Sequence, residues 1–161
     1  MIETIHIENI ALIESLDIDL SDGMNVLTGE TGAGKSIIID SIGMLLGNRA
    51  ARELIRTGKK SAYVSAIVGR IPDEVVLVMK ELGIEPDENG QVFIEREIFL
   101  DGKNVCRINS RTATASLLKK ISPYLINIHG QHDASSLMKP ESHIRLLDAF
   151  VKLSFREGVK C

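Results

Sequence analysis

The stretch GETGAGKS at residues 29–36 constrains the fold of this chain more strongly than its other sequence features. It has glycine at its first, fourth and sixth positions, and Lys35 and Ser36 complete it before an apolar run begins. Glycine reaches backbone conformations that are closed to other residues, so such a loop can curl with successive N–H groups pointing inward around an anion. The pattern G-x-x-x-x-G-K-[ST], known as Walker A, is typical of a loop that binds nucleotide phosphates.

The sequence around this loop predicts the strand and the helix that such a site requires. Met24 to Leu27 is a short apolar run that we interpret as a strand, and Lys35 to Leu46 has helical periodicity with Ile38 and Ile42 on one face. The amino end of the helix would add its unpaired N–H groups and the positive end of its dipole. A chance match in a glycine-rich turn would lack this context, so the stretch predicts a site for a nucleoside triphosphate.

The loop residues have distinct expected roles. Lys35 would bring a mobile positive charge to the outer phosphates, and the Ser36 hydroxyl would be a ligand of Mg²⁺. The sequence contains no N-K-x-D motif for guanine recognition, which favours ATP over GTP. The expected cofactors are therefore ATP and Mg²⁺. The expected cofactor-binding residues are Gly29, Glu30, Thr31, Gly32, Ala33, Gly34, Lys35, Ser36 and Ile37.

The remaining pattern predicts a mixed α/β fold in which antiparallel strands flank the strand–loop–helix unit, without the regular alternation of a doubly wound sheet. Glycine ends two of the predicted helices, and Asp101-Gly102 predicts a hairpin. Besides the two elements named above, strands are predicted within residues 1–20 and at 63–68, 91–100, 104–109 and 124–128, and helices at 72–82, 113–121 and 141–150.

Composition limits the classes of function. The 161 residues are 44% hydrophobic and 25% charged, which predicts one soluble globular domain. The formal charge of −3 means that contact with nucleic acid would need a local basic patch. The two cysteines predict a reducing compartment rather than a disulfide framework. The first twenty residues carry acids but no Lys or Arg, and no long uncharged run occurs, so we expect a cytoplasmic protein with no membrane contact.

A phosphate-loop ATPase also needs a carboxylate near the metal and a group that positions the attacking water. Asp101 follows an apolar run, but that run has the alternation of a half-exposed hairpin strand, so we interpret Asp101 as a turn residue. Asp40 and Asp148 lie in helical patterns. Gln131 follows the buried-looking strand 124–128 and could reach the Mg²⁺ and the water beside a γ-phosphate, although the residues alone favour a polar position in a glycine-rich loop.

Several stretches together resemble the RecN family of bacterial DNA repair proteins, which are SMC-like members of the ABC ATPase superfamily. The resemblance rests on IENIALIESLDIDL, GMNVLTGETGAGKSIIIDSI, LLGNRA, INIHGQHDASSL and RLLDAF, in that order, from about residue 1 to 150. The phosphate loop is shared by many families, whereas its combination with HGQH at 129–132 is far more specific.

The resemblance implies a fold and a site. It implies an ABC/SMC-type head lobe of a P-loop NTPase, with Gln131 as the Q-loop glutamine that senses Mg²⁺ and the γ-phosphate. Lys35 and Gln131 are then the expected catalytic residues, and Ser36 and Gln131 the expected metal ligands. In this family two heads sandwich two nucleotides and coiled coils extend from them, which implies self-association, and the proteins act on DNA in double-strand-break repair, which implies a place at the bacterial nucleoid.

The chain departs from the family pattern in ways that bear on turnover. It contains no LSGG-type signature, no hydrophobic strand ending in Asp-Glu and no later switch histidine. We therefore expect residues 1–150 to form the N-terminal half of a head, with 151–161 unassigned. Such a chain is expected to bind Mg-ATP with little or no turnover, because the catalytic glutamate would belong to the missing half.

Residues 49–60 form a basic run with five basic residues and one acid. It could bind DNA phosphates, or place an arginine near the nucleotide, although charge runs are usually solvated surface. His129 and His132 flank the Gln131 loop without a third ligand in range, so we predict no metal site there. The basic residues of the run are Arg49, Arg52, Arg56, Lys59 and Lys60.

Two alternatives come from other classes of function. One is a complete small P-loop kinase with Asp101 as its metal-binding acid, for which the basic run is poorly placed as a lid. The other is an assembly module that uses nucleotide without hydrolysis.

Overall fold

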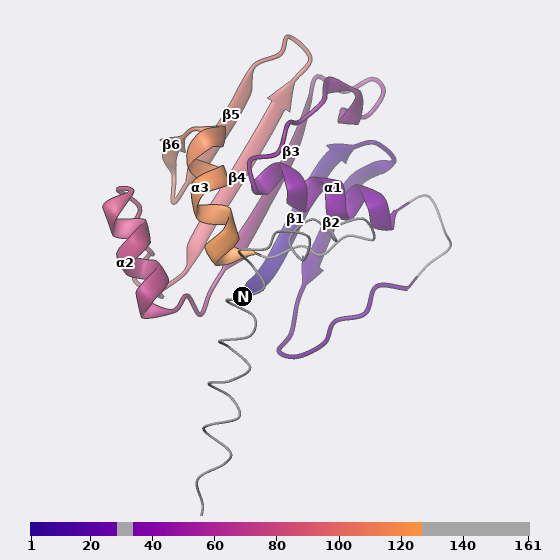
Figure 1. The fold of residues 1–161 in the computed structure, drawn as a ribbon. Helices are drawn as coiled ribbons and strands as arrows, with labels where there is room; N and C mark the ends of the chain where they lie inside the picture. The colour runs from indigo at the N-terminus through magenta and orange to yellow at the C-terminus, as the bar shows by residue number, and fades with distance from the viewer. Residues whose placement is uncertain (29–33, 127–161) are drawn as a thin grey trace, which may run out of the picture. The chain divides into compact units, whose positions relative to one another are not determined.

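The computed structural model of the chain describes residues 1–28 and 34–126, which belong to one compact unit, Met1–Asn127. Within it, a six-stranded sheet has the order β2-β1-β3-β4-β5-β6, and every neighbouring pair of strands is antiparallel (Figure 1). The strands are β1 Ile2–Ile10, β2 Ile13–Asp19, β3 Ser61–Val68, β4 Val92–Phe99, β5 Asn104–Ile108 and β6 Arg111–Ala113. The helices are α1 Lys35–Leu45, η1 Arg52–Leu54, α2 Asp73–Glu81 and α3 Ala115–Leu125.

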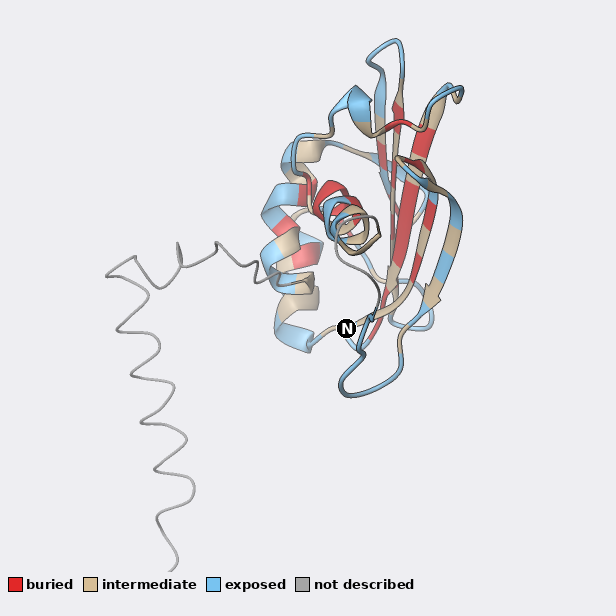
Figure 2. Ribbon diagram, turned by 90° about the vertical axis from the view of Figure 1, so that its right-hand side faces the viewer, coloured by how far each residue is buried: buried red, intermediate tan, exposed pale blue. Residues whose placement is uncertain are grey.

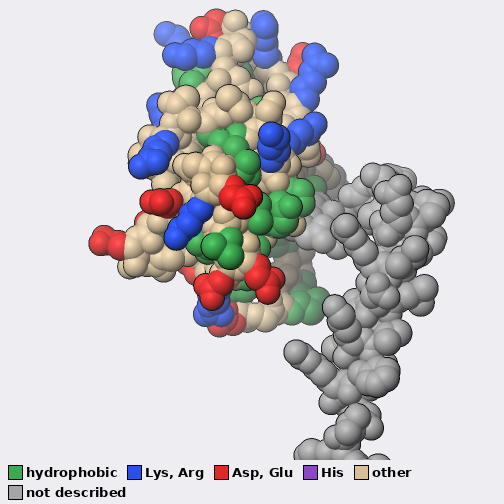
Figure 3. Space-filling view, turned by 60° about the vertical axis from the view of Figure 1, so that its left-hand side comes forward, with side chains coloured by type: hydrophobic (Ala, Val, Ile, Leu, Met, Phe, Trp, Pro, Cys, Tyr) green, Lys and Arg blue, Asp and Glu red, His purple; other side chains and the backbone are tan. Residues whose placement is uncertain are grey.

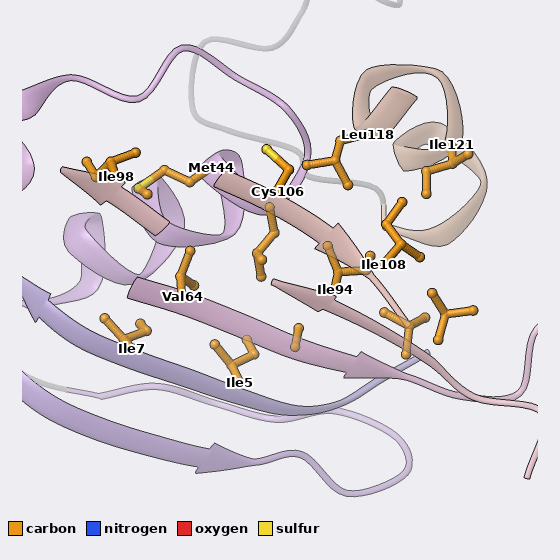
Figure 4. Close-up of a cluster of buried hydrophobic side chains, with 14 of the residues drawn as sticks. Ile5, Ile7, Met44, Val64, Ile94, Ile98, Cys106, Ile108, Leu118 and Ile121 are labelled. Carbon is orange, nitrogen blue, oxygen red and sulfur yellow. The ribbon is translucent and has the colours of Figure 1, made fainter. Parts of the chain in front are cut away.

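The hydrophobic core lies between the sheet and the helices, which occupy one side of it (Figure 2). The alternation predicted for the hairpin strand is confirmed, because every second residue of β4, beginning with Val92, is buried. Met44 of α1 and Leu118 and Ile121 of α3 close over this face together with side chains of the inner strands (Figure 4). The amphipathic strand pattern of the sequence thus determines which face of the sheet receives the helices.

The opposite face of the sheet is polar. The His6 ring lies 2.6 Å from Asp17 Oδ1, and the Tyr63 hydroxyl donates to Glu95 Oε1 at 2.9 Å. Partial burial raises the pKa of the Tyr63 phenol, so this hydroxyl remains a donor at neutral pH. Because side chains alternate across a strand, this polar face is the complement of the apolar one.

The predicted strands and those of the structure differ at three places. The first is the strand at 24–27, which is wrong: these residues form no strand, and Met24, Val26 and Leu27 are 89%, 65% and 51% exposed. An apolar run forms a strand only where another strand pairs with it, and within the described part of the chain no strand pairs with these residues.

The second is the strand predicted at 124–128, of which Tyr124 and Leu125 instead complete α3. Pro123 lies inside this helix and has no N–H group, so it cannot donate the usual helical hydrogen bond to Lys119 O. The Ser122 hydroxyl donates to that carbonyl at 3.3 Å, and Ile126 N donates to Ser122 O at 2.9 Å, so the last turn persists.

The third is β6, which the sequence did not predict. Asn109 and Ser110 have φ values of 47° and 64°, the left-handed pair that a two-residue hairpin turn requires. The turn folds β6 back onto β5, although its three residues are too few to show a periodic pattern. The predicted helix at 141–150 and the predicted domain boundary at 150 lie outside the described residues.

Candidate functional site

The expected phosphate site is described in part. Gly34, Lys35, Ser36 and Ile37 lie within the structure, whereas 29–33 lie outside the described residues. The predicted helix is confirmed as α1, which begins at Lys35 with Gly34 as its N-cap. Lys35 is half-buried and Ser36 is exposed, so the site residues that are described stand together in the first turn of one helix.

The amino end of α1 has the features that an anion site requires. Among the described residues no side chain caps this end, and the first turn carries no acid. The first N–H groups of a helix have no partner within the helix, and its dipole adds partial positive charge there. The donor set of backbone N–H groups, a lysine ammonium and a serine hydroxyl fits a phosphate chain with a divalent metal.

The carboxyl end of α1 closes in a Schellman motif. Asn48 N donates to Gly43 O at 3.1 Å and Gly47 N donates to Met44 O at 3.0 Å, with Gly47 at a φ of 82°. Gly47 also lies directly against α3, because a Cβ at this position would come within 2.5 Å of Ala115 O. The glycine predicted to end this helix is thus required twice, for its conformation and for the close approach.

Arg96 is a residue that the sequence reasoning noted only as an interruption of an apolar face. Its side chain is 2% exposed, and its Nη1 donates to Met44 O and Asn48 O, each at 2.6 Å. Burial lowers the pKa of this guanidinium, and burial raises the pKa of the neighbouring Cys106 thiol. The signal was present in the sequence, since an arginine on the buried face of a strand must find acceptors.

Of the acidic candidates, Asp101 and Asp40 are described and Asp148 lies outside the described residues. Asp101 accepts from Lys103 N at 2.9 Å within the β4–β5 turn, as expected of a turn residue. Asp40 is exposed on α1. In the described ranges no cluster of three or more His, Cys, Asp or Glu could hold a metal ion. Gln131, His129 and His132 lie outside the described residues, so the roles expected of Gln131 stay predictions.

The basic run at 49–60 is divided by the fold. Arg56 Nη1 donates to Leu12 O at 2.7 Å and holds the β1–β2 turn, and Lys59 Nζ lies 3.6 Å from Glu14 Oε1. Arg49, Arg52 and Lys60 are exposed. Arg56 is therefore a structural residue, while the other members of the run face solvent wholly or in part.

The fold adds one cation to the exposed part of this run. The Arg52 guanidinium lies against Gly102 in the β4–β5 turn, where Lys103 is the next residue, and Leu100 N donates to Lys60 O at 3.0 Å. In Figure 3, Lys and Arg side chains are numerous in the upper part of the molecule, the end that carries this turn in Figure 1. We name Arg49, Arg52, Lys59, Lys60 and Lys103 the basic end; sequence spacing gave no sign that Lys103 belongs to it.

No helix of the described residues is long and apolar enough to cross a membrane.

The comparisons with known proteins extend across nearly the whole chain. The model of the AAA domain family matches residues 4–152. The chain is 42% identical to the DNA repair protein RecN of Halalkalibacterium halodurans and 40% identical to that of Bacillus subtilis, over 93% and 99% of its length. It spans only 26% and 28% of these relatives, about a quarter of their length.

Solved structures agree on the fold. One, from work on ATP-driven dimerization and DNA stimulated activation of SMC ATPases, has a TM-score of 0.65 at 26% identity and covers 91% of this chain and 97% of its own. The Smc head domain of Pyrococcus furiosus with an extended coiled coil has a TM-score of 0.66 over 97% of this chain and 45% of its own, at 24% identity. The predicted resemblance and the predicted ABC/SMC-type P-loop lobe are thus confirmed, and this chain belongs to the AAA domain family, with the fold of an SMC-type ATPase head lobe and a sequence similar to the DNA repair proteins RecN.

Proposed function

We propose that this chain is the ATP-binding part of a RecN-like ATPase that acts in the repair of double-strand breaks in DNA. The observation that carries the proposal is the uncapped amino end of α1, where Lys35 and Ser36 stand in the first turn directly after the glycine-rich loop. A fold shared with SMC ATPase heads and the similarity to RecN proteins support the same assignment.

The roles within the site follow from the chemistry of each group. Residues 29–37 would surround the phosphates with their N–H groups, Lys35 would neutralise the β- and γ-phosphates, and Ser36 and Gln131 would complete the Mg²⁺ shell. The bound metal would neutralise charge that develops on the phosphates. Lys35 and Gln131 are the catalytic residues proposed here, since both would touch the γ-phosphate or the water beside it.

Hydrolysis in this proposal needs groups beyond the present chain. The apolar segment 24–27, which leads into the phosphate loop, is exposed along its length, and exposed apolar stretches of this kind often mark a surface that another part of a protein covers. Further strands of the head would cover it, and the same region would bring the catalytic carboxylate. A second head would then close over the nucleotide, so that self-association accompanies ATP binding, in keeping with the ATP-driven dimerization of SMC ATPases similar to this chain.

The first prediction concerns this binding without turnover. We expect isothermal titration with Mg-ATP to give a saturable heat and a rise in melting temperature, because a ligand that binds only the folded state stabilises it. We expect no multiple-turnover release of phosphate from the purified chain. Absence of both heat and thermal protection in folded protein would refute the nucleotide site. Transfer of phosphate to an acceptor would favour the small kinase, and dimerisation with ATP but without turnover in a complete head would favour the assembly module.

A second part of the proposal assigns DNA contact to the basic end. Arg52 of the basic run lies against the β4–β5 turn, in which Lys103 follows Gly102, on a chain whose net charge is −3. Each phosphate that a protein neutralises adds to the salt dependence of binding. Binding through phosphates would not depend on the base sequence of the DNA. It suits a protein that holds DNA during repair in the bacterial cytoplasm, at the nucleoid.

The second prediction tests this surface. The double substitution Arg52→Gln and Lys103→Gln is expected to weaken binding of duplex DNA and to reduce the slope of log K against log salt by about 0.9 for each phosphate that the variant no longer neutralises. The matched control is Arg70→Gln with Lys80→Gln, which removes the same charge; Arg70 follows the end of β3 that pairs with the start of β4, away from the β4–β5 turn. Equal effects of the two pairs would show only non-specific attraction, and the assignment would fail.

A further inference from the structure

Among the described residues, Arg96 is the one buried residue with a charged side chain. The other buried polar residues are Ser41 and Ser65. It stands in the middle of β4, on the face that packs against α1. A buried guanidinium is costly to desolvate, and apolar side chains of similar volume often serve stability as well or better. Its presence under α1 therefore calls for a reason beyond filling the core.

The contacts of Arg96 converge on the carboxyl end of α1. Nη1 donates to Met44 O and to Asn48 O at 2.6 Å each, and Nε donates to Asn104 Oδ1 at 3.1 Å. Within the described part of the chain no buried side-chain nitrogen or oxygen lacks a partner, so every fully buried nitrogen of this guanidinium is hydrogen-bonded. A positive charge at this end also complements the helix dipole. The guanidinium thus joins the helix that follows the phosphate loop to the β4–β5 hairpin.

The same end of α1 is held from a second side. Gly47 lies between the two residues whose carbonyls Arg96 binds, and a Cβ there would approach Ala115 O and Lys119 N of α3 to 2.5 Å and 2.8 Å. The carboxyl end of α1 is therefore fixed between β4 and α3. Since bonds to a planar guanidinium have defined directions, they set the orientation of the helix more narrowly than apolar packing does.

The orientation of α1 matters most at its other end. The helix has 11 residues, so with a rise of about 1.5 Å per residue it is roughly 16 Å long. A tilt of about 10° about the Arg96 contact would move Lys35 by about 3 Å, as much as the length of a hydrogen bond. Displacements of about 1 Å already impair sites that must hold a ligand in a defined geometry.

We propose that Arg96 is a positioning residue of the nucleotide site, which acts through α1 by fixing where Lys35 and Ser36 meet the phosphates of ATP. The proposal rests on the function proposed above and adds a residue that does not itself touch the nucleotide. If the role of Arg96 were purely structural, its replacement would lower the stability of the lobe and leave the affinity of the folded state for Mg-ATP unchanged. A positioning role predicts that this affinity falls as well.

The third prediction tests this separation with Arg96→Met and Arg96→Lys. Mg-ATP affinity is measured by titration calorimetry at a temperature at which circular dichroism shows each variant to be folded. We expect Arg96→Met to bind at least about tenfold more weakly than wild type, because α1 would no longer be held at two carbonyls and its first turn would shift against the phosphates. Arg96→Lys retains the charge but not the two-carbonyl geometry, and it is expected to recover only part of the affinity.

The control for reduced stability is Met79→Ala. Met79 is 1% exposed and belongs to α2, so its truncation destabilises the same core without altering a group that holds α1. We expect Met79→Ala to lower the melting temperature and to leave Mg-ATP affinity within about twofold of wild type, since its folded state keeps the Arg96 contacts. An equal loss of affinity in this control would attribute the effect to destabilisation and overturn the proposal.

The outcomes distinguish this proposal from the one on which it depends. If wild type binds Mg-ATP and folded Arg96→Met binds equally well, Arg96 is structural and the proposed function stands. If wild type does not bind, both proposals fail. Should Arg96→Met not fold, Arg96→Lys decides: a loss of about threefold or more supports the positioning role, and unchanged affinity refutes it.

Discussion

Replacement of Lys35 by alanine is expected to weaken the binding of Mg-ATP to this chain by roughly 10- to 150-fold. A hydrogen bond to a charged group contributes about 1.5–3 kcal/mol, and each 1.4 kcal/mol corresponds to about a tenfold change in affinity. Lys35 opens α1, and its ammonium would be the only full positive charge that the expected loop, residues 29–37, brings to the phosphates. Titration calorimetry of wild type and variant measures the ratio directly.

The matched control for this prediction is Lys80→Ala, which removes the same side chain from the last turn of α2. We expect it to leave Mg-ATP affinity unchanged. Both substitutions replace a lysine in a helix by a residue of high helix propensity, so neither should change the free energy of unfolding by much. A Lys35→Ala variant that binds Mg-ATP as tightly as Lys80→Ala would contradict the assignment of the phosphate loop.

The second large effect is expected from Gly47→Ala. At a φ of 82° an L side chain costs about 1–2 kcal/mol, and the new methyl group would lie within 2.5 Å of Ala115 O and 2.8 Å of Lys119 N. Both are backbone atoms, so α3 itself would have to move, which adds about 1–3 kcal/mol. Urea denaturation is expected to show a loss of about 2–5 kcal/mol in the free energy of unfolding, the sum of these two costs.

Gly83→Ala is the control for the steric part of this loss. Gly83 ends α2 with a φ of 75°, in the same kind of helix terminus, but a Cβ there would meet nothing within 4 Å. Its replacement should therefore cost only the conformational share, about 1–2 kcal/mol. Equal losses at the two glycines would show that the contact between Gly47 and α3 does not contribute to the stability of the lobe.

Much of this fold could be predicted from local patterns in the sequence. The alternation along β4 and the helical periodicity after Gly34 identified both elements, and glycine with positive φ ended α1 and α2 where expected. These predictions hold because each depends on residues close together in the chain. The candidate phosphate site could likewise be proposed from the sequence, since its residue types follow one another in a single motif.

The remaining features depend on what the fold brings together. Segment 24–27 is apolar enough for a strand, but a strand needs a paired neighbour, which sequence alone does not supply. Arg96 looked like a defect in an apolar face until the carbonyls of Met44 and Asn48 were seen to receive it. Lys103 belongs to the basic end because it follows Gly102, the residue of the hairpin turn against which Arg52 lies.

The position of β1 has a consequence for how the lobe forms. The first strand of the chain lies inside the sheet, with Ile5 opposite Ile18 of β2 on one side and Ala66 of β3 on the other, and the ammonium group of Met1 donates to Gly69 O. During synthesis β1 must therefore wait for β3 to leave the ribosome, and this long-range closure slows folding relative to a simple hairpin meander. An extension before Met1 would replace this ammonium group by an amide, whereas deletion of the first ten residues would remove the strand that joins β2 to the rest of the sheet.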